Sequence, residues 1–325
     1  MKLNKRLPAL LMAGVMSVSL LAGCGGDNGT YKVGICQLGP HPALDAASTG
    51  FQNKLTELME ADGKKVEITL QNANGETSSV ATIINGFVSS KCDLILANAT
   101  APLQTASAST GDIPILGTSV SDYGTALEID DFNGVTGINV SGTSDLAPLS
   151  EQAAMVKEWF PDAKNVGLVY CSAEANSKFQ IDTIKPELEA LGYTCTEYSF
   201  ADSNDLSTVA TKACDESDVL YVPTDNTVAE NTGIISNIAI PKKVPVIAGE
   251  EGICAGCGVA TLSISYEELG ETTAQMAYDV LVGGKDISSM EIQYAPTTTK
   301  KYNKEICDAL GLTPPEGYEA IESAE

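Results

Sequence analysis

Stretches typical of β-strands alternate with stretches typical of α-helices along this chain, and the series runs through twice. The strand-like runs are short and apolar, as strands covered on both faces of a parallel sheet are. We expect strands at 31–38, 66–71, 93–97, 113–116, 135–138, 166–170, 194–198, 219–222, 244–248, 259–263 and 292–294. Apolar spacings of three and four predict helices at 43–61, 77–89, 145–160, 177–191, 206–214, 266–282 and 304–310. This alternation predicts an α/β fold with two doubly wound parallel-sheet lobes.

Small polar residues follow several of these strands. The clearest case is 222–228, reading VPTDNTV, where Pro223 lacks an N–H group and ends the strand. Ligands of open α/β sheets bind just outside the carboxyl ends of the strands. Two such rims facing each other would form a cleft for a small ligand. The alternative is that Thr224 or Asp225 only caps the helix that follows.

The first residues resemble an export signal. Lys2, Lys5 and Arg6 precede an apolar stretch at 7–21 that is too short to span a membrane. The stretch ends in Leu-Ala-Gly-Cys, which resembles the bacterial lipobox with Cys24 as the lipidated residue. We therefore expect a lipoprotein signal peptide at 1–23 and a tether at 24–30. An ordinary secretory signal with a chance cysteine is the alternative.

The charge of the chain limits its partners. The formal net charge is −24, and residues 1–23 carry three positive charges and no acid, so removing them leaves −27. Such a charge argues against nucleic acid and anionic lipid headgroups as partners. Arg6 is the only arginine, and it would be removed with the signal peptide. A ligand carboxylate would therefore have to bind lysine, hydroxyls, amides or a helix N-terminus.

The residues that could carry catalysis or bind metal are few. His41 is the only histidine, and no spacing gives it a nucleophile or a metal partner, so we expect it at a helix start or rim. Cys254 and Cys257 form the one close cysteine pair. A local disulfide, free thiols and a redox-active pair all stay open, whereas a zinc site would want four ligands. The sequence predicts no enzyme, no cofactor and no metal.

Several motifs together resemble a known family. They are HPALD at 41–45, NAT at 98–100, TSVSD at 118–122, NGVTG at 133–137, VYCSAEANS at 169–177 and VPTDNTV at 222–228. In this order they resemble the tryptophan/tyrosine-type substrate-binding lipoproteins of ABC importers. The resemblance implies a type I periplasmic-binding fold whose lobes are joined by three hinge crossovers. It implies a first lobe of 31–140 plus 262–289 and a second of 141–261 plus 290–325.

The resemblance also implies a function and partners. A lipid-anchored monomer outside the cytoplasm of a bacterial cell would close on a small ligand and deliver it to ABC permease subunits. It would contact the membrane only through the lipid anchor. The ATPase would be a separate chain, since no Walker A pattern occurs here. A nucleoside or sugar receptor of the same fold, or a surface sensor without transport, are the alternatives.

An aromatic or other apolar amino acid is the ligand that the resemblance favours. Its ammonium group needs an anion, and its carboxylate needs hydrogen-bond donors. We assign the ammonium to Asp225 with support from Asn226 and Glu250. We assign the carboxylate to donors at two helix starts, namely Asn176, Ser177 and Thr100, with Asn98 in the same turn as Thr100. Asp45 and Asp122 are further candidates. Asp45 could instead only cap a helix or form a salt bridge, and Asp122 could instead only turn the chain.

Overall fold

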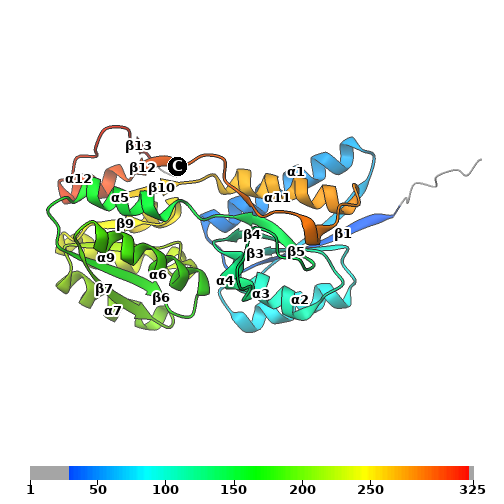
Figure 1. The fold of residues 1–325 in the computed structure, drawn as a ribbon, viewed down its shortest axis with the longest axis horizontal. Helices are drawn as coiled ribbons and strands as arrows, with labels where there is room; N and C mark the ends of the chain where they lie inside the picture. Colours follow the sequence, from blue (N-terminus) through cyan, green and yellow to red (C-terminus); the bar gives the residue numbers. More distant parts are fainter. Residues whose placement is uncertain (1–28, 322–325) are drawn as a thin grey trace, which may run out of the picture.

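The computed structural model describes residues 29–321, which form two α/β lobes side by side (Figure 1). Each lobe holds one sheet with helices on both faces, and the two sheets have six and seven strands. The predicted fold class, two doubly wound lobes with parallel sheets, is confirmed. The predicted signal peptide and most of the tether lie outside the described residues.

The first sheet has its strands in the order β11-β5-β4-β3-β1-β2, all parallel. Helices α1 and α11 lie side by side on one face, and α2 and α3 cover the other (Figure 1). The strands are β1 (Thr30–Gln37), β2 (Lys65–Asn72), β3 (Leu94–Asn98), β4 (Ile115–Val120), β5 (Val140–Ser144) and β11 (Gln293–Tyr294). The helices are α1 (Pro42–Ala61), α2 (Thr77–Ser89), α3 (Thr100–Ser109), α4 (Tyr123–Leu127), α11 (Tyr266–Leu281) and the 3₁₀ helix η1 (Ile287–Ser289).

The second sheet has the order β13-β12-β10-β9-β8-β6-β7. It is parallel except that β12 runs antiparallel to β10. The strands are β6 (Asn165–Cys171), β7 (Thr194–Phe200), β8 (Val219–Val222), β9 (Val246–Ala248), β10 (Ala260–Ser263), β12 (Thr299–Tyr302) and β13 (Glu319–Ala320). The helices are α5 (Leu149–Trp159), α6 (Ala175–Ala190), α7 (Ser203–Glu216), α8 (Asn226–Glu230), α9 (Thr232–Lys242), α10 (Glu251–Cys257) and α12 (Lys304–Leu310).

The chain crosses between the two sheets three times. The crossings are 145–148 after β5, 264–265 after β10 and 295–298 after β11. The predicted lobe ranges differ from these crossings in two places. They gave 141–144 and 293–294 to the second lobe, but both segments belong to the first sheet. They gave 262–263 to the first lobe, but these residues belong to β10 of the second sheet. All eight cysteines of the described chain are free, including Cys254 and Cys257 in α10.

Strand β5 corrects the prediction of a strand at 135–138. Only Val135 makes a bridge there, and the strand lies five residues later. Its sequence, VSGTS, has one apolar residue, so it carries no apolar signal. Its hydroxyls are paired inside the lobe: the Ser141 Oγ donates to the Met290 carbonyl at 3.0 Å, and the Thr143 Oγ1 lies 2.8 Å from the Thr273 Oγ1. Buried hydroxyls are tolerated when they have such partners.

Two glycines let α1 and α11 approach each other closely. A Cβ on Gly270 would lie 2.1 Å from the Ala47 carbonyl oxygen, and one on Gly50 would lie 2.3 Å from the Glu267 carbonyl oxygen. Both obstacles are backbone atoms, which cannot rotate away. The packing of this helix pair therefore requires glycine at these positions.

We expect Gly270→Ala to lower the free energy of unfolding by about 1–3 kcal/mol, because the added methyl group forces the helices apart. The measurement is urea unfolding followed by circular dichroism. Gly86→Ala is the matched control, since Gly86 also lies in a helix but faces open space. There alanine should raise stability by up to about 1 kcal/mol. Equal effects of the two substitutions would contradict this account of the helix packing.

Candidate ligand-binding site

The carboxyl ends of the two sets of strands face each other. His41 follows β1, and its Nε2 lies 3.2 Å from the Oδ1 of Asn226 at the start of α8. Ser121 follows β4, and its Oγ accepts a hydrogen bond from the Nε2 of Gln180 on α6 at 3.2 Å. Both contacts join one lobe to the other. The polar turns that the sequence singled out therefore border one interlobe cleft.

The rim of the first lobe contains strained backbone and polar atoms without partners. Ala99 and Ser119 are buried and have φ of 101° and 55°. Such conformations cost about 1–3 kcal/mol each and cluster at binding sites. Three buried atoms here have no hydrogen-bond partner within the described residues, namely the His41 Nδ1, the Asn98 Oδ1 and the Ser119 Oγ. Ligand groups that enter the cleft can satisfy such atoms.

Helix α3 begins at this rim without a side-chain cap. Its N-cap residue is Ala99, which has no oxygen to offer, and Thr100 at the first helical position is buried. The first N–H groups of a helix have no partner within the helix, and they favour a negative charge. The start of α3 is therefore suited to a carboxylate.

Asp225 lies at the centre of the second lobe's rim. Its Oδ1 accepts from the Val228 N–H at 2.9 Å, which caps α8. Its Oδ2 accepts from the Cys171 N–H at 2.7 Å and from the Ser177 Oγ at 2.8 Å. Burial, followed by the nearby charge of Glu174, raises the pKa of the Asp225 carboxyl well above its usual range. The residue both holds three elements together and presents a desolvated carboxylate.

Glu174, which the sequence analysis did not single out, organises the same rim. Its Oε2 accepts from the Asn226 N–H at 3.0 Å and from the Asn226 Nδ2 at 2.7 Å. Its Oε1 accepts from the Thr227 N–H at 2.8 Å and from its Oγ1 at 2.7 Å. The loop before α6 is thereby tied to the start of α8. In the sequence, the position of Glu174 within the motif 169–177 is the one feature that could have indicated its role.

Glu250 plays a similar part after β9. Its carboxylate caps α10 by accepting from the N–H groups of Gly252, at 2.7 Å, and of Ile253. Burial raises the pKa of Glu250 to about 7, against the opposing effect of these hydrogen bonds. The negative charge of Asp145 adds to the shift.

Asp145 is a further buried carboxylate that the sequence analysis missed. It follows β5 at the first crossing between the lobes. It accepts from the Ser121 Oγ at 2.9 Å and from the Tyr266 hydroxyl at 3.0 Å. Burial raises its pKa. Because Tyr266 begins α11 just after the second crossing, Asp145 joins two of the hinge segments.

The buried acids of the cleft have no buried cation beside them. Asp145, Asp225 and Glu250 are all at least 95% buried, and no lysine or arginine is buried among the described residues. Carboxylates in such surroundings are stabilised by an added positive charge. The cleft therefore favours a ligand with a cationic group.

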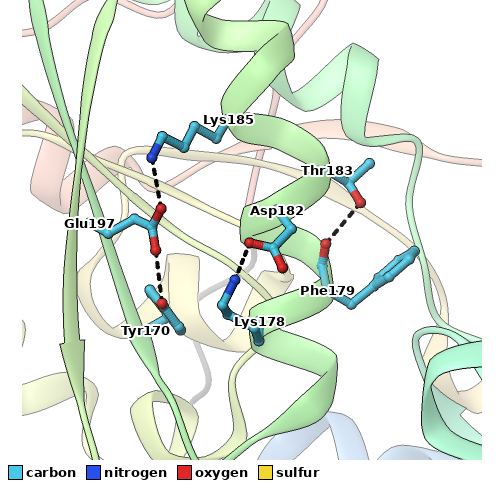
Figure 2. A network of polar contacts seen from close by, with 7 residues as sticks. All are labelled: Tyr170, Lys178, Phe179, Asp182, Thr183, Lys185 and Glu197. Atoms are coloured by element: carbon cyan, nitrogen blue, oxygen red, sulfur yellow. Dashed lines mark hydrogen bonds and ion pairs between the residues drawn. The ribbon is translucent and has the colours of Figure 1, made fainter. Parts of the chain in front are cut away.

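Two cavities flank the interlobe contact. One of about 560 Å³ lies where the start of α1 meets α10, with Pro42, Glu250 and Tyr266 in its wall. Another of about 470 Å³ lies between Thr125 of α4 and the residues Lys178 and Phe179 of α6. Figure 2 shows this outer side of α6, where Lys178 pairs with Asp182 one turn away and Phe179 stands beside them. The cleft thus has a cavity on each side.

Farther along α6, a second set of polar contacts fastens the helix to the sheet of the second lobe. The Glu197 Oε1 accepts from the Lys185 Nζ at 2.8 Å, and its Oε2 accepts from the Tyr170 hydroxyl at 2.9 Å (Figure 2). These residues belong to α6, β7 and β6. The contacts join α6 to β6 and β7.

The predicted site residues fall into two groups. One group borders the cleft: Asn98 and Thr100 lie at the rim of the first lobe, and Asn176, Ser177, Asp225, Asn226 and Glu250 lie at the rim of the second lobe. Asp45 is exposed in the first turn of α1, where its Oδ1 accepts from the Gln37 Nε2 at 2.6 Å. Asp122 caps α4 by accepting from the Thr125 N–H at 2.6 Å. Asp122 therefore serves as a helix cap, as Asp225 does for α8.

The fold and the cleft together define a solute-binding protein of the type I periplasmic-binding class. Over residues 32–321 the chain matches the family of ABC transporter substrate binding proteins, and it belongs to that family. Members of this family bind substrates without converting them, and they act outside the cytoplasm. No helix within residues 29–321 is long and apolar enough to cross a membrane.

Three relatives place the chain within the family. A tyrosine-binding protein of Clostridioides difficile strain R20291 is 33% identical over 323 residues, which cover 95% of this chain and 93% of that protein. A Streptococcus pneumonia ABC domain in complex with L-Trp has a TM-score of 0.84 at 29% identity, covering 90% of this chain and all of that one. A ligand-free, open Clostridium difficile substrate-binding protein with adhesive properties has a TM-score of 0.69 at 38% identity, with the same coverage.

We expect Asp145→Asn to raise the free energy of unfolding increasingly as the pH rises. The pKa of Asp145 is higher in the folded protein than in the unfolded chain, so its contribution favours folding at low pH and is lost as the pH rises through the folded value. Each unit of the difference corresponds to about 1.4 kcal/mol. Both partners are hydroxyls, which can donate or accept, so asparagine keeps the two hydrogen bonds.

Urea unfolding at about pH 4 and pH 8, where the unfolded aspartate changes from half to wholly ionised, measures this difference. The control is Asp162→Asn, which removes the same charge from an exposed position. A D145N protein that is less stable than the wild type at the higher pH would contradict the argument.

Proposed function

We propose that this protein is a lipid-anchored solute receptor of an ABC importer that binds an aromatic amino acid, tyrosine or tryptophan, between its lobes. It would be attached outside the cell membrane through Cys24, which lies outside the described residues. As a monomer, it would deliver the amino acid to the permease subunits of the importer. The names of the tyrosine-binding relative and of the L-Trp complex support this choice of ligand.

The observation that carries the proposal is the opposite chemistry of the two rims. The second lobe presents buried carboxylates without a buried cation, and the first presents an uncapped helix start beside the partnerless hydroxyl of Ser119, which can donate to a carboxylate. A zwitterion fits such a pair. Its ammonium group would lie by Asp225 and Glu250, and its carboxylate at the start of α3 beside Thr100 and Ser119.

This assignment moves the ligand carboxylate away from Asn176 and Ser177. The Asn176 Nδ2 already donates to the Glu174 Oε2 at 3.1 Å and to the Thr224 carbonyl at 3.0 Å. The Ser177 Oγ donates to Asp225. Their donors therefore bind partners within the second lobe. We propose that Ser177 positions Asp225, and that Asn176 and Asn226 position the loop at Glu174.

The arrangement of the lobes supports a closed cleft. The chain superposes better on the L-Trp complex than on the ligand-free, open structure, although the latter is more similar in sequence. Relative rotation of two lobes lowers the similarity of whole chains even when each lobe is alike. The contacts His41–Asn226 and Gln180–Ser121 are those expected of closed lobes.

We expect tyrosine or tryptophan to raise the melting temperature of the purified protein. A ligand at a hundredfold excess over its dissociation constant stabilises the folded state by about 2.7 kcal/mol. The measurement is a thermal-shift screen of the twenty amino acids, nucleosides and simple sugars. A shift with a nucleoside or sugar, and with no amino acid, would replace the proposal with a receptor for that class.

We expect the affinity for the amino acid to increase with pH between about 6 and 8. An ammonium group stabilises the ionised forms of Glu250 and Asp225, whose pKa values burial has raised, so binding releases protons. Titration calorimetry in buffers of different ionisation enthalpy measures this release. The des-amino analogue of the ligand is the control, and it should take up protons or exchange none. Proton uptake with the amino acid itself would show that the ammonium group lies elsewhere.

A further inference from the structure

His41 occupies an unusual position for the only histidine of the chain. It stands at the N-cap of α1, in the loop that follows β1. The residue lies between the lobes and is only 6% exposed. It makes no side-chain cap of α1. Its Nε2 contacts Asn226 of the opposite lobe, and its Nδ1 has no partner among the described residues.

The orientation of the Asn226 amide determines the roles of the two imidazole nitrogens. The Asn226 Nδ2 lies 2.7 Å from a Glu174 oxygen, and a carboxylate can only accept a hydrogen bond there. The atom that faces His41 is therefore the amide oxygen, which is an acceptor. Hence the His41 Nε2 carries the hydrogen and donates it across the cleft.

In the neutral imidazole the other nitrogen must then be an unprotonated acceptor. Burial lowers the pKa of His41, against the smaller opposing effects of its hydrogen bond and of nearby negative charges, so the neutral form is favoured. A buried acceptor without a donor costs about 1–3 kcal/mol. The closed cleft therefore contains an unfilled position for a hydrogen-bond donor at the His41 Nδ1.

The charges around this nitrogen favour a cationic donor. Glu174 of the second lobe and Asp45 of α1 both act on the imidazole through their negative charges. A positive ligand group beside the Nδ1 would be stabilised by both carboxylates.

We propose that His41 is a ligand-binding residue whose Nδ1 accepts a hydrogen bond from the ligand's ammonium group while its Nε2 bonds to Asn226 and holds the lobes closed. The inference rests on the proposed function, because it needs an amino-acid ligand. One side chain would then couple recognition of the amine to closure. His41 would accept a hydrogen bond from the ammonium group on the side of the first lobe, and the carboxylates of the second lobe would supply the counter-charge of that group.

The single histidine makes a direct test possible. Untagged protein labelled with ¹⁵N in histidine gives the imidazole signals of His41 alone. We expect the Nδ1 signal to move upfield when tyrosine or tryptophan saturates the protein, because an unprotonated nitrogen that accepts a hydrogen bond shifts in that direction. The Nε2 should stay protonated. An Nδ1 signal that does not move at saturation would overturn the inference.

Two variants separate the roles of the two nitrogens. His41→Gln keeps an N–H donor near the Nε2 position and has no acceptor near the Nδ1 position, whereas His41→Asn has the reverse. We expect His41→Gln to weaken amino-acid binding by about tenfold or more and to leave binding of the des-amino analogue unchanged. His41→Asn should weaken both ligands alike, since it loses only the contact with Asn226. Equal loss of both ligands in His41→Gln would overturn the assignment.

Failure of the inference and failure of the proposed function give different results. Wild-type protein that binds no amino acid would remove the proposed function, and this inference with it. Wild-type protein that binds tyrosine or tryptophan, with an unchanged Nδ1 signal, would remove the inference alone. Thermal unfolding of each variant without ligand shows whether a loss of affinity comes from a loss of folding.

Discussion

The cleft depends on buried carboxylates that accept hydrogen bonds from backbone N–H groups at helix starts. Asp225 caps α8 and also bonds to the end of β6, and Glu250 caps α10. Glu174 bonds to the first N–H groups of α8 from the loop before α6. A helix N-terminus stabilises a negative charge, so Asp225 and Glu250 can be buried without lysine or arginine beside them, and the half-buried Glu174 is stabilised in the same way. The same bonds fix the loops that line the cleft.

This arrangement leaves the site rigid in its second lobe and incomplete in its first. The acids of the second lobe have their oxygens paired, whereas His41, Asn98 and Ser119 on the opposite rim each retain a buried atom without a partner. Strained backbone at Ala99 and Ser119 lies on the same side. Binding energy from a ligand can offset both costs. Under the proposed function, this asymmetry would let a cleft without arginine select a zwitterion.

The hinge uses the same chemistry as the cleft. Asp145, at the first crossing, bonds to Ser121 beside the cleft and to Tyr266 at the second crossing. Gln180 on α6 then reaches Ser121 from the other lobe. A continuous set of hydrogen bonds therefore runs from the crossings to the cleft, and lobe closure and the state of the hinge carboxylate are physically connected.

The sequence by itself determined the fold class, because a run of short apolar strands separated by amphipathic helices can bury its apolar faces only as doubly wound parallel sheets. It also placed Asp225, Asn226 and Glu250 at strand ends that border the cleft. It did not reveal β5, whose VSGTS sequence lacks an apolar pattern, and it ended the preceding strand at residue 116, although β4 continues to Val120. Hydroxyl pairs within the lobe stabilise β5, and local propensity contains no trace of them.

Only the tertiary structure decided which polar residues face the ligand and which support their neighbours. Asp45 and Asp122 look equivalent to Asp225 in sequence, yet Asp45 is exposed and Asp122 half-buried, whereas Asp225 is fully buried. Glu174, Asp145 and His41 gain their importance from partners 52, 121 and 185 residues away. Side-chain partners at such separations are set by how the two lobes pack. The local sequence around each residue therefore cannot predict these partners.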